Sequence, residues 1–218
     1  MRVTRRGALA MMLALAGCAG KKKEKTMDLL GAAAEGDAAE VRAALRDGAD
    51  IEQRDEKRRT ALLLAVTGDH VEAAGELVRA GADPDALDDR HDTPFLVTGV
   101  TGSVAMLRVL MPAKPDLTIR NRFGGTALIP ACERGHVDYV REVIGTGIAV
   151  DHVNDLGWTG LLEAVILGDG SEPYIRVVKI LIEGGADVGL ADKDGVTPLA
   201  HAESRGFGEI AALLRAVR

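Results

Sequence analysis

RTALLLAV at residues 59–66 is the most informative segment for the fold, because close variants of it recur along the chain. The variants are DTPFLVTG (92–99), GTALIPAC (125–132), WTGLLEAV (158–165) and VTPLAHAE (196–203). Their threonines Thr60, Thr93, Thr126 and Thr159 follow one another at steps of 33 residues, and Thr197 follows after 38. A fixed period of this length predicts a solenoid of stacked repeats.

Each copy carries signals for a tight turn followed by two helices. Five positions before each threonine stands a short side chain that favours turns, and these are Asp55, Asp88, Asn121, Asn154 and Asp192. The threonine is suited to cap the first helix. Two positions before it, Gly124, Gly157 and Gly195 supply a positive φ, but Arg58 and His91 stand there in the earlier copies, which predicts less ideal turns.

A second helix in each repeat ends, in four cases, at a glycine suited to a left-handed stop: Gly48, which precedes the first phrase, and Gly81, Gly147 and Gly185. Counted from the unit that ends at Gly48, the third repeat carries DTPFLVTG and has Lys114 at this position, beside Pro112 and Pro115, so we expect that repeat to be distorted. Aromatic residues make up only 3% of the chain while hydrophobic residues make up 47%. Small aliphatic side chains therefore fill the core, as thin stacked helices require.

These phrases, with closing turns such as RAGADPDA, resemble the ankyrin repeat. The resemblance implies an all-α fold, an ankyrin-repeat α-solenoid of helix-turn-helix pairs with β-hairpin fingers. It covers residues 27–218, which divide into predicted repeats at about 27–54, 55–87, 88–120, 121–153, 154–191 and 192–218. The first and last repeats are predicted to be capping repeats, each with one face exposed to solvent. The step of 38 residues carries five more residues than the others, near 168–173. They are either a tolerated loop insertion or a specific contact at the edge of the stack.

The amino end predicts export. Residues 1–17 carry Arg2, Arg5 and Arg6, an apolar run from Ala8 to Ala16 and small residues, as in a signal peptide. The nine-residue apolar run is shorter than the roughly 20 residues that a spanning helix needs. The phrase LAGC (15–18) looks like the lipobox of bacterial lipoproteins, which implies cleavage before Cys18 and acylation of that cysteine. The alternative is an ordinary cleaved signal with an incidental cysteine.

Residues 18–26 then form a charged tether between the acylated cysteine and the repeats. Its lysines, among them Lys21 and Lys25, are solvated or attract anionic head groups. The protein would therefore lie close to a membrane on its periplasmic side, and Ala19 implies the outer membrane if the cell has one. Arg5 and Arg6 also resemble a twin-arginine export signal, so the export route stays open between that and the general pathway.

Charge argues against a nucleic-acid partner. Removal of residues 1–17 takes away three arginines and no acidic residue from 27 basic and 33 acidic ones, which leaves a balance of −9. Binding to phosphates needs a concentrated basic surface. We therefore expect no nucleic-acid partner. We expect a protein partner, contact with the membrane through the lipid anchor at Cys18, and a monomer.

The sequence nominates no catalytic group, cofactor or metal. No phosphate loop, paired-cysteine zinc motif or nucleophile elbow occurs. His70 and His136 share one repeat position, and the resemblance implies a structural hydrogen-bonding role for both. Cys132 fits a small buried slot. A remote alternative is an enzyme that uses Asp169, Glu172 and carboxylates of the finger tips.

The finger tips offer the candidate binding residues. Arg120, Arg122, Phe123, Leu156 and Trp158 belong to the fourth and fifth fingers or lie beside them, where ankyrin repeats place recognition residues. Large apolar groups next to arginines have the composition of a binding hot spot. The alternative is that Trp158 folds back on its own hairpin and covers the repeat junction.

The resulting interpretation is a non-enzymatic protein-binding module, anchored by lipid outside the cytoplasm, that docks or inhibits a partner through its concave face and finger tips. Two narrower roles stay open: an immunity-type inhibitor of an envelope toxin, and an accessory protein of an envelope enzyme that handles oxidants.

Overall fold

In the computed structural model, residues 28–217 are described, and they form twelve α-helices in successive pairs. The predicted signal peptide, Cys18 and the tether lie outside these residues. The inner helices are α1 (Leu29–Glu35), α3 (Ala61–Thr67), α5 (Pro94–Thr101), α7 (Leu128–Glu133), α9 (Gly160–Ile166) and α11 (Pro198–Ser204). The outer helices are α2 (Ala38–Arg46), α4 (Val71–Arg79), α6 (Val104–Leu110), α8 (Val137–Ile144), α10 (Glu172–Glu183) and α12 (Gly208–Ala216).

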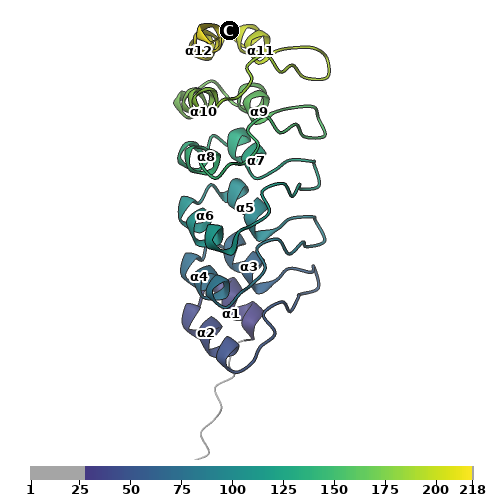
Figure 1. The fold of residues 1–218 in the computed structure, drawn as a ribbon, viewed down its shortest axis with the longest axis vertical. Helices are drawn as coiled ribbons and strands as arrows, with labels where there is room; N and C mark the ends of the chain where they lie inside the picture. The colour runs from purple at the N-terminus through teal and green to yellow at the C-terminus, as the bar shows by residue number, and fades with distance from the viewer. Residues whose placement is uncertain (1–27, 218) are drawn as a thin grey trace, which may run out of the picture.

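The pairs stack in one direction to form an elongated solenoid, as the sequence predicts (Figure 1). Each inner helix contacts the next inner helix, each outer helix contacts the next outer helix, and the two helices of a pair contact each other. The fingers that join the pairs all project to the side of the inner helices (Figure 1). Because every layer covers the apolar side of its neighbours, the stack buries a core that no single pair could bury.

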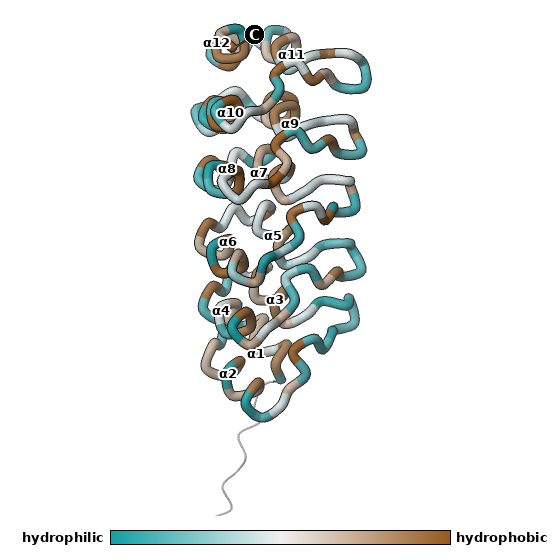
Figure 2. The backbone as a smooth tube through the Cα atoms, in the orientation of Figure 1, coloured by the Kyte–Doolittle hydropathy of each residue, from teal (hydrophilic) through white to brown (hydrophobic). Residues whose placement is uncertain are grey.

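The outer helices are amphipathic, with hydrophobic and hydrophilic residues alternating around them (Figure 2). Their apolar sides pack into two clusters of buried residues. One includes Leu29, Val41, Leu62 and Leu77, and the other runs from Phe95 and Leu96 to Leu214. The clusters meet in α6, where Met106 belongs to the first and Leu107 to the second.

The threonines cap the inner helices as predicted, except in one repeat. The hydroxyls of Thr60, Thr93, Thr159 and Thr197 accept hydrogen bonds from the amide three residues later, at 3.1–3.3 Å. Thr126 does not cap α7, and its buried Oγ1 has no hydrogen-bond partner among the described residues. The cause is Pro130, which has no N–H to give to the Thr126 carbonyl. The Ile129 amide bonds to that carbonyl instead, at 3.1 Å.

The third repeat is distorted, as predicted. Its outer helix α6 runs into a 3₁₀ turn, η1 (Met111–Ala113), which contains Pro112. Lys114 follows in a left-handed conformation with a φ of 56°, where other repeats place glycine. Arg58 and His91 also have positive φ, 58° and 61°, which confirms that the first two predicted turns are less ideal than those with glycine.

Polar side chains also link several layers to the layer before them. The ring Nε2 of His70 donates to the Ala34 carbonyl at 3.0 Å, and that of His136 donates to the Val100 carbonyl at 3.1 Å. These bonds give both histidines the structural role that the resemblance implies. In the fifth repeat the Tyr174 hydroxyl takes the same role and donates to the Glu133 carbonyl at 2.9 Å.

The insertion near 168–173 is part of the packed body. It runs into the first turn of α10, whose 12 residues make it the longest helix among residues 28–217. Gly170 has a φ of 76°, and an added Cβ there would lie 2.5 Å from the ring of Phe207. The loop therefore packs closely against the last repeat.

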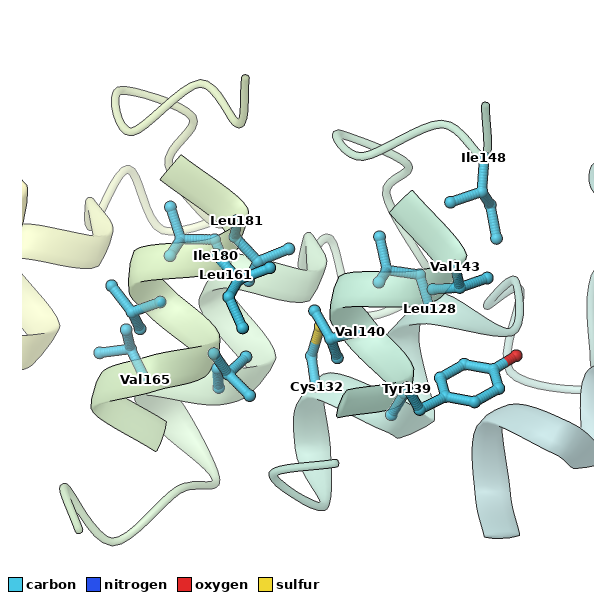
Figure 3. Close-up of a cluster of buried hydrophobic side chains, with 14 of the residues drawn as sticks. Leu128, Cys132, Tyr139, Val140, Val143, Ile148, Leu161, Val165, Ile180 and Leu181 are labelled. Atoms are coloured by element: carbon cyan, nitrogen blue, oxygen red, sulfur yellow. The ribbon is translucent and has the colours of Figure 1, made fainter. Parts of the chain in front are cut away.

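Cys132 lies in the apolar interior between α7 and α9 (Figure 3). Burial raises the pKa of its thiol well above the usual range, and the nearby charge of Glu163 adds to the shift. The thiolate is therefore disfavoured, and Cys132 serves as a small core residue. No helix within residues 28–217 combines the length and the apolar character needed to cross a bilayer.

Candidate functional site

Each finger is a short hairpin fixed by its turn residue. In the fifth finger the Asn154 amide donates to the Trp158 carbonyl at 3.0 Å. The Asn154 side-chain oxygen accepts from the amides of Leu156 and Trp158, both at 3.0 Å. Gly157 completes the turn with a φ of 87°. Between residues 28 and 217 only Arg54 and Thr60 form an antiparallel bridge, so the fingers are turns with little strand character.

Neighbouring fingers are held together by their backbones. The Asp155 amide donates to the Phe123 carbonyl at 3.0 Å, and the Asp89 amide donates to the Lys57 carbonyl at 3.1 Å. His152 adds a brace, because its ring Nε2 donates to the Gly124 carbonyl at 2.6 Å. The fourth and fifth fingers therefore present their tips in a fixed register.

A hollow of about 370 Å³ lies between these two fingers and the inner helices α7 and α9. We call it the C-terminal hollow. Phe123, Leu156 and Leu167 line it, and 57%, 55% and 49% of their surface is exposed. Exposed large apolar side chains grouped in this way are typical of interaction surfaces.

One carboxyl group lies in the wall of this hollow. Glu163 of α9 is only 4% exposed, and its Oε1 accepts a hydrogen bond of 2.6 Å from the Asn154 side-chain amide. Burial raises the pKa of Glu163 to about 7, although the Asn154 bond opposes the shift, and the charge of Glu133 raises it further. A buried group with a perturbed pKa in a concave surface is a candidate functional residue.

The sequence analysis missed Glu163. The equivalent positions in the other repeats, four residues after the threonine, are Leu64, Val97, Pro130 and His201. Three of these four residues are apolar, so a glutamate at the fifth equivalent position was the sequence signal that could have pointed to Glu163. His201 makes a matching contact, since its Nε2 lies 2.7 Å from Asp192 Oδ2, so this position joins the inner helix to the finger turn in both repeats.

A second hollow of about 580 Å³, the N-terminal hollow, continues from the first along the second, third and fourth fingers. It is rich in charge, with Lys57, Arg59, Arg90, Arg122 and Arg134 facing Asp88, Asp92 and Glu133. Arg122 stands at the boundary of both hollows. Its guanidinium lies 3.4 Å from Asp92 and 4.4 Å above the ring of Phe123.

Burial raises the pKa of Asp92, and the neighbouring charge of Asp88 adds to this. Arg122 opposes the shift, so its charge partly compensates for the crowded carboxylates. The two hollows together form one concave groove beneath the fingers, mixed in charge at one end and largely apolar with carboxyl groups at the other.

The structure brings together three of the five predicted partner-binding residues. Arg122, Phe123 and Leu156 line the C-terminal hollow. Arg120 is exposed but lines neither hollow. Trp158 is half-buried and also lines neither. Binding by any of these residues stays a prediction. Cys18 lies outside the described residues.

Two of the carboxylates of the enzyme alternative, Asp169 and Glu172, do not line the groove, whereas the finger-tip carboxylates Asp92 and Asp155 do. Asp169 accepts a hydrogen bond of 2.9 Å from the Ser171 amide, and the interaction with Ser171 lowers its pKa. Glu172 begins α10 and is exposed. Across residues 28–217 no group of three or more histidine, cysteine, aspartate or glutamate residues is placed to hold a metal ion.

A stack of helical pairs with an open groove under rigid fingers defines a repeat-solenoid scaffold, a class whose extended concave surfaces serve binding. The chain belongs to the ankyrin repeat family. A model of three ankyrin repeats matches residues 95–192, and a single-repeat model matches residues 57–89. Ankyrin repeats generally mediate protein–protein interaction.

Relatives match over almost the whole described region. The chain is 43% identical over 193 residues to the putative ankyrin repeat protein YahD of Escherichia coli K12. The matched segment covers 88% of this chain and 96% of YahD. A crystal structure of an ankyrin repeat domain from Acinetobacter baumannii AYE is 47% identical with a TM-score of 0.84, over 87% of this chain and 96% of that one. The ankyrin repeat domain of Bcl-3, a member of the IκB family, is 27% identical with a TM-score of 0.79, over 88% of this chain and 86% of that one.

Proposed function

We propose that this protein is a non-enzymatic binding module, anchored by lipid at Cys18 to the periplasmic side of a bacterial membrane, that docks a partner protein in its concave groove. The observation that carries the binding role is the pair of exposed apolar side chains, Phe123 and Leu156, on two fingers locked in register. A preformed surface of this kind loses little conformational freedom on binding. The mechanism is steric: the partner is held near the membrane or blocked, with no bond made or broken.

The lipid anchor is supported by the layout of the amino end alone. The basic start, the short apolar run and the LAGC phrase precede a tether of nine residues from Cys18 to Met27. Such a tether reaches at most about 30 Å when extended. The groove would then meet partners that lie at or near the membrane surface.

Replacement of both exposed finger residues tests the binding role. We expect Phe123→Ser with Leu156→Ser to reduce capture of the partner from detergent-solubilised envelope by about tenfold or more, because apolar anchors at the centre of an interface dominate its affinity. Capture is quantified by mass spectrometry. Val217→Ser is the matched control, since Val217 is 51% exposed and lies at the far end of the stack. Equal capture by the wild type, the double variant and Val217→Ser would show that the partner does not bind in the groove.

The identity of the captured protein then separates the narrower roles. A toxin whose activity is suppressed by the wild-type chain indicates an immunity-type inhibitor. An envelope enzyme that handles oxidants indicates an accessory protein.

Replacement of Cys18 tests the anchor. We expect Cys18→Ser to abolish incorporation of an alkyne-labelled fatty acid and to move the protein from the membrane fraction to the released fraction, because serine offers no thiol for the lipid. Cys132→Ala is the control, since its thiol is fully buried. Unchanged membrane retention of the Cys18 variant would contradict the anchor.

A further inference from the structure

Three carboxyl groups of the C-terminal hollow have no cationic partner in the described chain. Glu133, Asp155 and Glu163 all line the hollow. The ion pairs formed within residues 28–217 use none of the three. Glu133 and Glu163 oppose each other, because the charge of Glu133 raises the pKa of Glu163. The hollow therefore holds three carboxyl groups that no ion pair within residues 28–217 engages.

The one cation in its lining is already occupied. Arg122 pairs with Asp92 and lies over the ring of Phe123. Lys193, on the next finger, bonds to the Asp155 backbone carbonyl and leaves the Asp155 carboxylate free. The lining therefore contains three carboxyl groups and a single guanidinium, which already pairs with Asp92. This charge balance favours a positively charged occupant.

The apolar part of the hollow limits what that occupant can be. Phe123, Leu156 and Leu167 form exposed walls beside the nearly buried Glu163. Within residues 28–217 the carboxyl groups are not close enough together to hold a metal ion. An alkyl chain that ends in a cationic head matches both features, because the chain lies along apolar surface while the head reaches the carboxylates.

We propose that the C-terminal hollow binds an arginine or lysine side chain of the partner polypeptide, with its alkyl part against Phe123 and Leu156 and its cationic head at Glu163 and Glu133. This rests on the proposed protein-binding function and specifies its chemistry. The head takes the place of the missing counter-ion. Arginine can add a bidentate contact to a carboxylate, and lysine acts as a point charge.

The groups that face Glu163 make this binding depend on pH. They are Glu133 and Cys132 on α7, Arg122 on the fourth finger and Asp155 on the fifth, while His201 on α11 is held by Asp192. A bound cation favours the ionised form of Glu163. By linkage the cation binds more tightly above pH 7, where Glu163 is ionised, than near pH 5.

The test uses propylguanidinium and butylammonium, the side-chain equivalents of arginine and lysine, with 1-pentanol as the neutral control. The full chain in detergent micelles carries ¹³C at its aspartate and glutamate carboxyl carbons. At pH 8 we expect either cation to shift the Glu163 signal saturably, and 1-pentanol to leave it in place. At pH 5 the same titration should weaken, and the stronger of the two cations indicates which side chain the hollow prefers.

Variants decide whether the site is the one proposed. We expect Glu163→Gln to weaken cation binding, followed by the ring signals of Phe123, by about tenfold or more. Glu172→Gln removes an exposed carboxylate outside the groove and should leave binding unchanged, and the melting temperature of each variant checks its fold. Equal shifts with 1-pentanol, shifts without saturation, or full binding by Glu163→Gln would each overturn the cation site. If the Phe123→Ser and Leu156→Ser variant loses partner capture but the wild-type chain binds neither cation, the proposed function is retained and this cation site is rejected.

Discussion

Glu163→Gln is expected to raise the free energy of unfolding at pH 8 by about 2 to 3 kcal/mol and to leave it nearly unchanged at pH 4. Burial raises the pKa of Glu163 from 4.5 to about 7, so the folded state resists ionisation of this group. Glutamine has the shape of the protonated acid and keeps an oxygen that accepts from Asn154. The gain is placed below the full value of the shift, because the hollow is open to water.

The direction of the pH dependence follows from the raised pKa. The folded protein binds this proton more tightly than the unfolded chain does, so the stabilising contribution is present below pH 4.5 and is lost as the pH rises through 7. Urea unfolding at pH 4, 5, 6, 7 and 8 measures the loss. Carboxylates with lowered pKa, such as Asp55 and Asp192, act below this window and are common to both proteins. Parallel pH profiles of the wild type and Glu163→Gln would contradict the prediction.

The destabilisation caused by ionised Glu163 bears on the proposed function. An ionised Glu163 without a counter-ion destabilises the free protein, and a cation that binds in the hollow relieves the destabilisation. A glutamine at this position would stabilise the stack and lose the charge. Stability and recognition therefore oppose each other at Glu163, as they often do at binding sites.

Tyr139→Ala is expected to cost about 4 kcal/mol and to split the cooperative unfolding of the solenoid into two transitions. Tyr139 is 0% exposed and is among the largest fully buried side chains in residues 28–217. Its ring extends from α8 toward the preceding repeat (Figure 3). The Thr98 hydroxyl donates to the Phe95 carbonyl at 2.7 Å, so the Tyr139 hydroxyl donates to Thr98 Oγ1, also at 2.7 Å.

The split is expected because this contact joins the fourth repeat to the distorted third repeat, and we call this connection the weak junction. The two buried clusters meet in the third repeat, where Pro112 and Lys114 distort the outer helix. In a stack that is held only by contacts between neighbours, loss of one interface uncouples the two sides. The N-terminal hollow spans this junction, so partner binding there depends on the coupling.

Two probes follow the two sides. Trp158 is the only tryptophan, and its fluorescence reports the fifth repeat, while far-ultraviolet circular dichroism reports all helices. For the wild type the two urea transitions should coincide, and for Tyr139→Ala they should separate. Tyr139→Phe keeps the ring, loses one hydrogen bond and should cost about 1 kcal/mol without a split. Coincident transitions in Tyr139→Ala would refute the weak junction.

Most of the fold could be predicted because its determinants are local. The threonines, the turn residues Asp55 to Asp192 and the positive-φ glycines each act within a few residues, and a period of 33 residues repeats them. Even the distorted third repeat followed from Lys114 and its neighbouring prolines. The failure of Thr126 to cap α7 also has a local cause, because Pro130 has no amide hydrogen and the Ile129 amide bonds to the Thr126 carbonyl instead of the hydroxyl.

The candidate site depended on contacts between distant residues. The repeat period alone predicts that helical pairs stack and that Phe123 and Leu156 lie on neighbouring fingers. Contacts between the layers make Trp158 half-buried, engage Arg122 with Asp92, and leave Glu163 almost buried beside Glu133. Local patterns fix backbone geometry, whereas burial and charge balance depend on which residues of adjoining layers meet, and that is set when the stack forms.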